Sequence, residues 1–217
     1  MKSDSQLKKD VSEELKWEPS VNATQIGVEV KDGVVTLAGH VDSYAEKWNA
    51  ETAAQRVSGV KALAVEMDVK LPGYSARTDG DIGRSAEHAL SWTSYLPKDA
   101  IKIMVERGFV TLTGEVEWEY QRNVAAMTIR HLMGVTGVSN QIRIKATASA
   151  ALVKEGIEAA IKRRAATDAK EISVSVKGSD VTLKGHVHSW SERELATNAA
   201  WGAKGVHKVF DEMTMAY

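Results

Sequence analysis

The stretch VKDGVVTLAGHV, residues 30–41, outlines a β-hairpin. Apolar residues alternate with polar or small ones from residue 26 to residue 31 and again from residue 34 to residue 41, which is typical of half-buried strands. Between the two runs lies Asp32-Gly33, a pair favoured in the tight turns of antiparallel hairpins. The stretch therefore predicts two antiparallel strands joined by a short turn.

This stretch occurs three times, because VERGFVTLTGEV at 105–116 and VKGSDVTLKGHV at 176–187 repeat its pattern. When the copies are aligned on the glycine near their end, an isoleucine precedes it by 13 residues and Gly-Val follows it by 20 residues, without a gap. Identities at fixed offsets in three copies indicate internal duplication. A spacing of about 70 residues suits a small domain better than a solenoid unit.

Each copy has a helical pattern on either side of the hairpin. Before it, apolar residues recur every four positions, at Leu7, Val11 and Leu15 in the first copy. After it, Ser43 and Ser189 begin S-x-x-E capping boxes that lead into alanine-rich helices, and a last strand is expected over 60–69, 135–144 and 206–215. The sequence thus predicts an α+β protein of three tandem α-β-β-α-β domains. Each is expected to be a three-stranded mixed sheet with two helices on one face.

The predicted domains span residues 1–71, 79–145 and 150–217, with linkers at 72–78 and 146–149. Six glycines are interpreted as structural residues. Three lie on the second strand of each hairpin, where we expect them on the buried face opposite the alanine-rich helix, and three follow that helix. They are Gly39, Gly114, Gly185, Gly59, Gly134 and Gly205.

The composition excludes several classes of protein. The chain has 217 residues and a formal net charge of -1, which gives no basic field for nucleic acid, and it contains no cysteine. No apolar run is long enough to span a bilayer. The N-terminal stretch shows no secretory signal, so we expect a cytoplasmic protein, or a periplasmic one if a signal has been removed.

The sequence favours no catalytic residue, no metal and no cofactor. His186 and His188 lie two residues apart on a predicted strand and would share a face, but the same positions hold His40 and Asp42 in the first copy. We therefore interpret them as polar surface residues. No nucleotide-binding or hydrolase motif is present, and the protein is expected not to be an enzyme.

Aromatic residues supply the candidate contact sites. Trp17 and Trp92 share one repeat position, where we expect them to cover the core at the edge of the sheet. Four further aromatic residues at strand-to-helix junctions suit either a membrane interface or partner surface, or local packing. They are Tyr44, Trp118, Tyr120 and Trp190.

A basic amphipathic helix in the third copy carries Lys162, Arg163 and Arg164. These cations can contact anionic lipid, or they can complement the C-terminal end of their own helix while its apolar stripe packs on the sheet. The three sheet faces that bear Thr36, Thr111 and Thr182 have no predicted helix over them, so they are candidate surfaces for self-association.

The repeated order α-β-β-α-β, the core V-x-D-G-V-V-T-L-x-G-x-V at 30–41 and the later Gly-Val resemble the BON domain family. The resemblance implies a bacterial, envelope-associated protein of the osmotic stress response, such as the osmotically induced periplasmic members, that binds phospholipid or the cell-envelope periphery. The alternatives are a cytoplasmic sensor of potassium or a small ligand, as another family member implies, and a protein-binding scaffold or chaperone.

Overall fold

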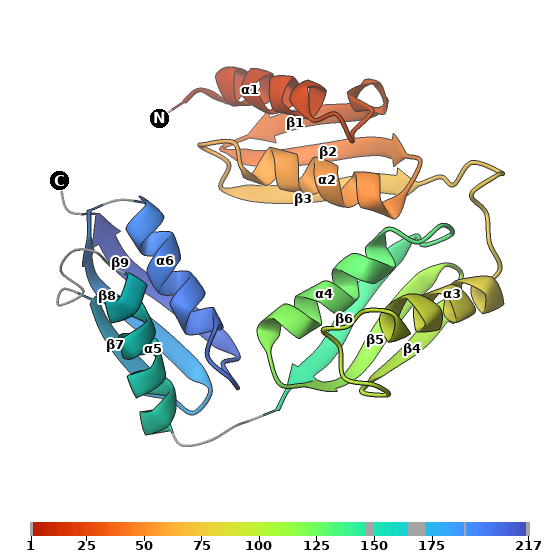
Figure 1. Cartoon of the computed structure of the whole chain (residues 1–217). Helices are drawn as coiled ribbons and strands as arrows, with labels where there is room; N and C mark the ends of the chain where they lie inside the picture. The colour runs from red at the N-terminus through yellow and green to blue at the C-terminus, as the bar shows by residue number, and fades with distance from the viewer. Residues whose placement is uncertain (1, 146–149, 165–171, 189, 216–217) are drawn as a thin grey trace. The chain divides into compact units, whose positions relative to one another are not determined.

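The computed structural model of the chain describes residues 2–145, 150–164, 172–188 and 190–215 (Figure 1). It contains three three-stranded sheets with the orders β1-β2-β3, β4-β5-β6 and β7-β8-β9. Each sheet belongs to one copy of the repeated sequence. The predicted fold class, α+β with three α-β-β-α-β repeats, is confirmed.

The elements recur in the same order in each repeat. The first repeat consists of α1 (Asp4–Trp17), a short 3-10 turn η1 (Ala23–Gln25), β1 (Ile26–Lys31), β2 (Val34–Val41), α2 (Tyr44–Gln55) and β3 (Ala62–Val69). The second consists of α3 (Asp79–Ser91), β4 (Ile101–Glu106), β5 (Phe109–Val116), α4 (Glu119–Arg130) and β6 (Gly137–Ile144). The third consists of α5 (Ala150–Arg164), β7 (Ile172–Lys177), β8 (Asp180–Val187), α6 (Trp190–Trp201) and β9 (Lys208–Met215).

Strand pairing follows the predicted topology. In the first repeat β1 pairs antiparallel with β2, from Ile26 opposite Gly39 to Lys31 opposite Val34, and β2 pairs in parallel with β3. The third repeat has the same register, with Ile172 opposite Gly185. The central strand therefore takes part in one antiparallel and one parallel ladder. The helix between the last two strands makes the crossover that a parallel pair requires.

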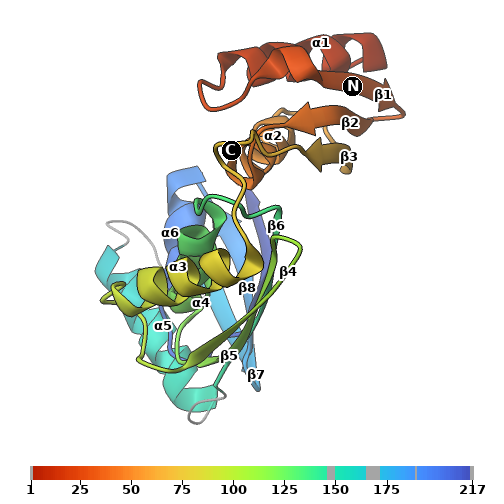
Figure 2. The same cartoon turned by 90° about the vertical axis from the view of Figure 1, so that its right-hand side faces the viewer.

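Both helices of a repeat lie on one face of its sheet, as Figure 1 and Figure 2 show for α1 and α2 over β1-β2-β3. Burial alternates along β2, where Val35, Leu37 and Val41 are buried. The four-residue face of α1 is also buried, at Leu7, Val11 and Leu15, and it meets the alanines of α2. The core of each small repeat thus lies in a single layer between two helices and one sheet face.

The caps of the second helices differ among repeats. The Ser43 hydroxyl accepts a hydrogen bond from the Glu46 N–H at 3.1 Å, which confirms the serine half of the predicted capping box. The Glu46 carboxylate accepts a hydrogen bond from the Asp42 N–H at 2.9 Å, one residue before the cap. In the third repeat Glu192 accepts from the His188 N–H at 2.8 Å. Ser189, the other half of that predicted box, lies outside the described residues.

The prediction for the strand glycines was wrong about their neighbour. Gly39 and Gly114 are not buried beneath the alanine-rich helix, and their φ angles are +133° and +134°. A Cβ atom at Gly39 would lie 2.1 Å from the carbonyl oxygen of Gln25, and one at Gly114 would lie 2.0 Å from that of Ala100. Glycine is required because the backbone just before the first strand passes this close, and because the conformation disfavours side chains. Gly185 shares the conformation, with a φ of +128°.

The three glycines after the second helices also have positive φ angles, of 107° at Gly59, 87° at Gly134 and 80° at Gly205. They lie in the turn that follows α2, α4 and α6. The last strands begin two residues later than predicted, at residues 62, 137 and 208, since the preceding residues belong to this turn. Val60, for example, donates its N–H to the Val57 carbonyl at 3.3 Å.

The prediction that Trp17 and Trp92 cover the core was also wrong. Trp17 is 82% exposed and Trp92 is 78% exposed. Trp17 ends α1 outside the helix face that buries Leu7, Val11 and Leu15, which agrees with its exposure. Two large aromatic side chains are therefore displayed at the same repeat position.

Candidate functional site: an aromatic cluster in the second repeat

Three aromatic rings meet where α3 leads into β4 and β5 leads into α4. The ring centroids of Tyr95 and Tyr120 are 6.4 Å apart with the planes at 83°, an edge-to-face pair. The centroids of Trp118 and Tyr120 are also 6.4 Å apart, with a tilt of 36°. The structure thus brings the two predicted residues Trp118 and Tyr120 together and adds Tyr95 from another loop. These three residues are called the aromatic cluster below.

Gln121 holds the two loops of the aromatic cluster together. Its side-chain oxygen accepts hydrogen bonds from the N–H groups of Glu117, at 3.1 Å, and Trp118, at 3.2 Å. Its side-chain nitrogen donates to the Tyr95 carbonyl at 2.9 Å. The corresponding residues of the other repeats, Glu46 and Glu192, cap their helices through carboxylates, which cannot donate. Gln121 therefore caps α4 with its side-chain oxygen and also holds the loop of Tyr95 with its side-chain nitrogen.

The aromatic cluster is displayed to solvent. Tyr95 is 64% exposed, Tyr120 is 49% exposed and Trp118 is half-buried. Glu119, between Trp118 and Tyr120 in the sequence, pairs with Arg122 at 3.0 Å. Burial raises the pKa of the Glu119 carboxyl, and the Arg122 charge opposes that rise. The Glu119 carboxyl is thus partly desolvated, while the rings of Tyr95 and Tyr120 remain accessible.

The fold itself does not require these aromatic rings. In the gap-free register of the repeats, the positions of Tyr95, Trp118 and Tyr120 hold only small residues in the other two copies. These are Ser20, Ser43 and Ala45 in the first copy and Ala166, Ser189 and Ser191 in the third. The first repeat forms the same sheet and helices with such residues. Sequence reasoning missed Tyr95 and Gln121, although this comparison of copies was available to find them.

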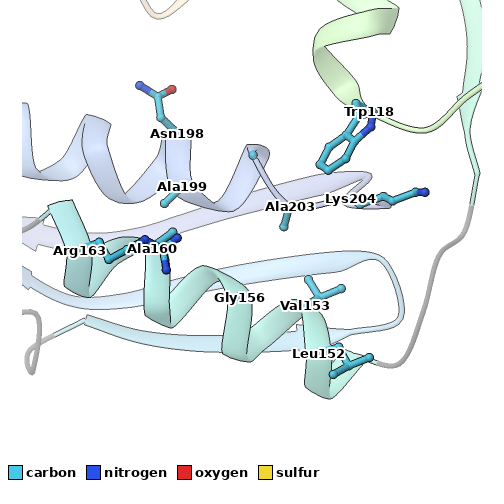
Figure 3. A pocket seen from close by; sticks show the side chains of 11 residues that line it. Trp118, Leu152, Val153, Gly156, Ala160, Arg163, Asn198, Ala199, Ala203 and Lys204 are labelled. Carbon is cyan, nitrogen blue, oxygen red and sulfur yellow. The ribbon is translucent and has the colours of Figure 1, made fainter. Parts of the chain in front are cut away.

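The other predicted contact residues lie elsewhere. Tyr44 begins α2 and is half-buried, and burial raises the pKa of its hydroxyl. Lys162 and Arg163 are exposed at the end of α5, and Arg163 borders a hollow between α5 and α6 (Figure 3). Trp118 is also among the residues around that hollow. The side chains of Arg164 and Trp190 lie outside the described residues.

The two strand histidines of the third repeat are both exposed, and His186 Nδ1 lies 2.9 Å from the Thr214 hydroxyl. Within the part of the chain that the structure describes, no group of three or more histidine and acidic side chains is placed to hold a metal ion. Among the described helices, none has both the length and the apolar character needed to cross a bilayer.

Solved structures resemble this chain only weakly. CdsD, a structural protein of the type III secretion system of Chlamydia trachomatis, is 15% identical with a TM-score of 0.28, and the match covers 97% of this chain and 92% of that one. The periplasmic domain of the inner-membrane protein PrgH from S. typhimurium is 12% identical with a TM-score of 0.23, over 88% of this chain and 95% of that one. Scores this low carry no argument about arrangement or function.

Sequence similarity is more informative. The chain is 27% identical over 150 residues to the osmotically-inducible protein Y of Escherichia coli strain K12, which covers 65% of this chain and 73% of that protein. The BON domain model matches residues 3–70, 78–146 and 150–217, so each repeat is matched separately and almost the whole chain is covered. These matches coincide with the three sheets described above, and the chain belongs to the BON domain family.

Proposed function

We propose that this protein is a non-catalytic binding protein of bacterial osmotic stress physiology that attaches to the surface of phospholipid membranes through the aromatic cluster of its second repeat. One observation carries the proposal. The second repeat displays aromatic rings at positions where its two sister repeats have serine or alanine, on the same backbone fold. Side chains that the fold does not need are best explained by a contact outside the repeat.

The chemistry of the rings suits the interfacial region of a bilayer. Tyrosine and tryptophan have an apolar body and a polar tip, so they are favoured where one end is apolar and the other is wet. The loop that carries Tyr95 also carries the exposed Trp92 and Lys98. A basic residue near an anionic surface contributes roughly 1 kcal/mol of attraction. The proposed contact is therefore an aromatic insertion, with Lys98 as the basic residue of the loop and Asp99 next to it.

The stress context comes from the relative in Escherichia coli, whose name records induction by osmotic conditions. A role in osmotic stress is compatible with a protein that binds a membrane surface and catalyses no reaction. Attachment through aromatic side chains needs no spanning segment, because rings at the headgroup level hold a protein on one leaflet.

Vesicle flotation tests the proposal. The whole chain is mixed with vesicles of phosphatidylglycerol and phosphatidylcholine, or of phosphatidylcholine alone, at low and high salt. We expect flotation with the anionic vesicles that weakens in salt, because surface charges are screened. The double variant Tyr95→Ala/Tyr120→Ala should lose flotation while its far-ultraviolet circular dichroism stays unchanged.

The first repeat offers a matched control. Trp17→Ala removes a tryptophan that is as exposed as Trp92 and occupies the same repeat position, but lies in a repeat without the aromatic cluster. This variant should float like the wild type, whereas Trp92→Ala should float less. An equal loss in both variants, or no flotation of the wild type under any condition, would overturn the proposal.

A further inference from the structure

A hollow of about 450 Å³ lies between α5 and α6 of the third repeat (Figure 3). Its walls are mostly small or apolar side chains, including Val153, Ala160, Ala199 and Ala203, together with Gly156. Arg163 borders it near the C-terminal end of α5, and Leu152 lies at the other end of the helix. A volume of this size falls within the range of small-molecule sites.

The hollow lies where the third repeat lacks the bridge that spans the corresponding helices of the first. There, the Arg56 guanidinium from the end of α2 binds the carboxylates of Glu14 and Glu18, at 2.5 and 3.0 Å, across the gap to α1. In the register of the repeats, Arg56 corresponds to Gly202 and Glu14 corresponds to Ala160. The third repeat thus replaces both partners of the Arg56–Glu14 pair with residues too short to cross the gap.

A further substitution deepens the hollow. Asp10 of the first repeat, which pairs with Lys2 at 2.7 Å, corresponds to Gly156. A Cβ atom placed on Gly156 would meet no atom within 4 Å, so the space beside this glycine is open. A glycine inside a helix costs stability relative to alanine. Packing therefore gives no reason for its presence here.

Charge at the rim selects the kind of ligand. Arg163 takes the place of Trp17 in the repeat register, and among the described residues no acidic side chain forms an ion pair with it. The other cation at the rim, Lys204, already pairs with Glu117 at 2.9 Å. An apolar hollow beside an arginine that has no acidic partner within the described part of the chain is complementary to a molecule with an apolar body and one anionic group.

We propose that the hollow between α5 and α6 binds a small anionic amphiphile, with the apolar body against Gly156, Ala160, Ala199 and Ala203 and the anionic group on Arg163. The occupant is a single free amphiphile of carboxylate type. The site is formed mainly by the third repeat. Trp118 of the aromatic cluster also borders it, whereas Tyr95 and Tyr120 do not.

The test is a titration of the whole isotope-labelled chain with sodium octanoate below its micelle concentration, followed by amide chemical shifts in NMR. We expect saturable shifts that are largest at Gly156, Ala160, Ala199 and Arg163. Octylammonium has the same chain with the opposite charge, and 1-octanol has no charge. Both should bind more weakly, and equal affinity for all three would contradict the role of Arg163.

Three variants locate the site. Gly156→Leu places a large side chain in the hollow, so it should abolish the saturable shifts. The repeat should stay folded, because a Cβ atom at this position meets no atom within 4 Å. Gly156→Ala adds only a methyl group and should retain binding. Arg163→Gln should weaken octanoate binding roughly tenfold, the effect of losing one charge-assisted hydrogen bond.

Two outcomes would overturn the proposal. The first is wild-type shifts that do not saturate, or that spread over all three repeats. The second is unchanged octanoate binding in Gly156→Leu. Vesicle flotation of Gly156→Leu is expected to match the wild type, so failure of this proposal is distinguishable from failure of the membrane proposal.

Discussion

The carboxylate of Asp79 accepts a hydrogen bond from the backbone N–H of Gly108 at 2.8 Å, which ties the first turn of α3 to the hairpin turn between β4 and β5. Its other oxygen accepts from the Arg107 N–H, also at 2.8 Å. Asp4 binds the corresponding turn of the first repeat in the same way, at 2.8 and 3.1 Å. These paired hydrogen bonds from an aspartate to the hairpin turn are called the clamp below. In the repeat register the third copy has Ala150 at this position, and alanine has no oxygen in its side chain to accept such bonds.

The clamp should stabilise whichever repeat carries it. Asp79→Ala is expected to lower the free energy of unfolding of the second repeat by about 1–2 kcal/mol, because two charge-assisted hydrogen bonds to turn N–H groups are lost. Ala150→Asp should raise the stability of the third repeat by a similar or smaller amount. Urea unfolding combined with amide hydrogen exchange of each repeat measures both changes.

A control separates the clamp from the helix dipole. Ala151→Asp places the same charge in the first turn of α5, where any acidic residue is favoured by about 0.3–1 kcal/mol, but one residue away from the clamp position. If Ala151→Asp stabilised the third repeat as much as Ala150→Asp, the clamp would have no part in the effect.

Substitution of Gly114 should be among the most damaging single-methyl changes in the chain. Gly114→Ala would place a Cβ atom 2.0 Å from the Ala100 carbonyl oxygen, at a φ of +134°. Relief requires β4 to move, and we expect a loss of about 2 kcal/mol or more, since the backbone itself must shift. Thermal unfolding of the whole chain checks this.

Gly156→Ala is the matched control for Gly114→Ala. The added methyl group meets open space inside a helix, so this variant should gain about 0.5–1 kcal/mol from helix propensity. The same chemical change is thus expected to have opposite signs at the two sites. Equal effects at both positions would show that the carbonyl approach at Gly114 does not constrain the fold.

Gln121 gives a prediction about the aromatic cluster. Gln121→Glu keeps the acceptor for the Glu117 and Trp118 N–H groups but replaces the donor to Tyr95 with an oxygen facing the Tyr95 carbonyl. We expect a loss of about 1–3 kcal/mol from this buried, repulsive contact. The Tyr95–Tyr120 ring contact should loosen, which near-ultraviolet circular dichroism and ring-to-ring nuclear Overhauser effects detect.

The first repeat contains the reverse control. Glu46 also accepts two backbone N–H groups, from Asn22 at 2.7 Å and Asp42 at 2.9 Å, but donates to no carbonyl. Glu46→Gln should therefore have a smaller effect than Gln121→Glu. Comparable losses in the two variants would mean that the Tyr95 carbonyl is not the reason for glutamine in the second repeat.

The internal repeat is the reason why most of the fold was predictable. The turn at Asp32-Gly33, the four-residue face through Leu7, Val11 and Leu15, and the alternation along β2 each fix one element locally. Three copies in one register then confirm the element order. The reason for glycine at position 39 was not predictable. A side chain there would collide with the carbonyl of Gln25, and this contact depends on the angle at which the chain enters β1.

The candidate site was only half predictable for a similar reason. Trp118 and Tyr120 lie at one junction and are visible as neighbours in the sequence, whereas Tyr95 joins them through a loop 23 residues before Trp118. Trp17 looked like a core residue because large aromatic rings are usually buried, yet its helical position lies outside the buried stripe. Helical phase would have predicted its exposure better than residue type did.

The contact between α1 and α2 should make the first repeat sensitive to acid. The hydrogen bond from the Ser20 hydroxyl to Glu18, at 2.7 Å, and the Arg56 guanidinium, at 3.0 Å, lower the pKa of the Glu18 carboxyl below its ordinary value of 4.5. A carboxyl with a lowered pKa in the folded state contributes stability above about pH 4.5, and that contribution is lost as the pH falls through the folded-state value.

Glu18→Gln should therefore destabilise the first repeat at pH 7 and flatten the decline of its stability below pH 4.5. Arg56→Gln should act in the same direction. Hydrogen exchange of the α1 and α2 amides between pH 3 and 7 measures this, and a slope below pH 4.5 that is identical in the wild type and both variants would contradict the assignment.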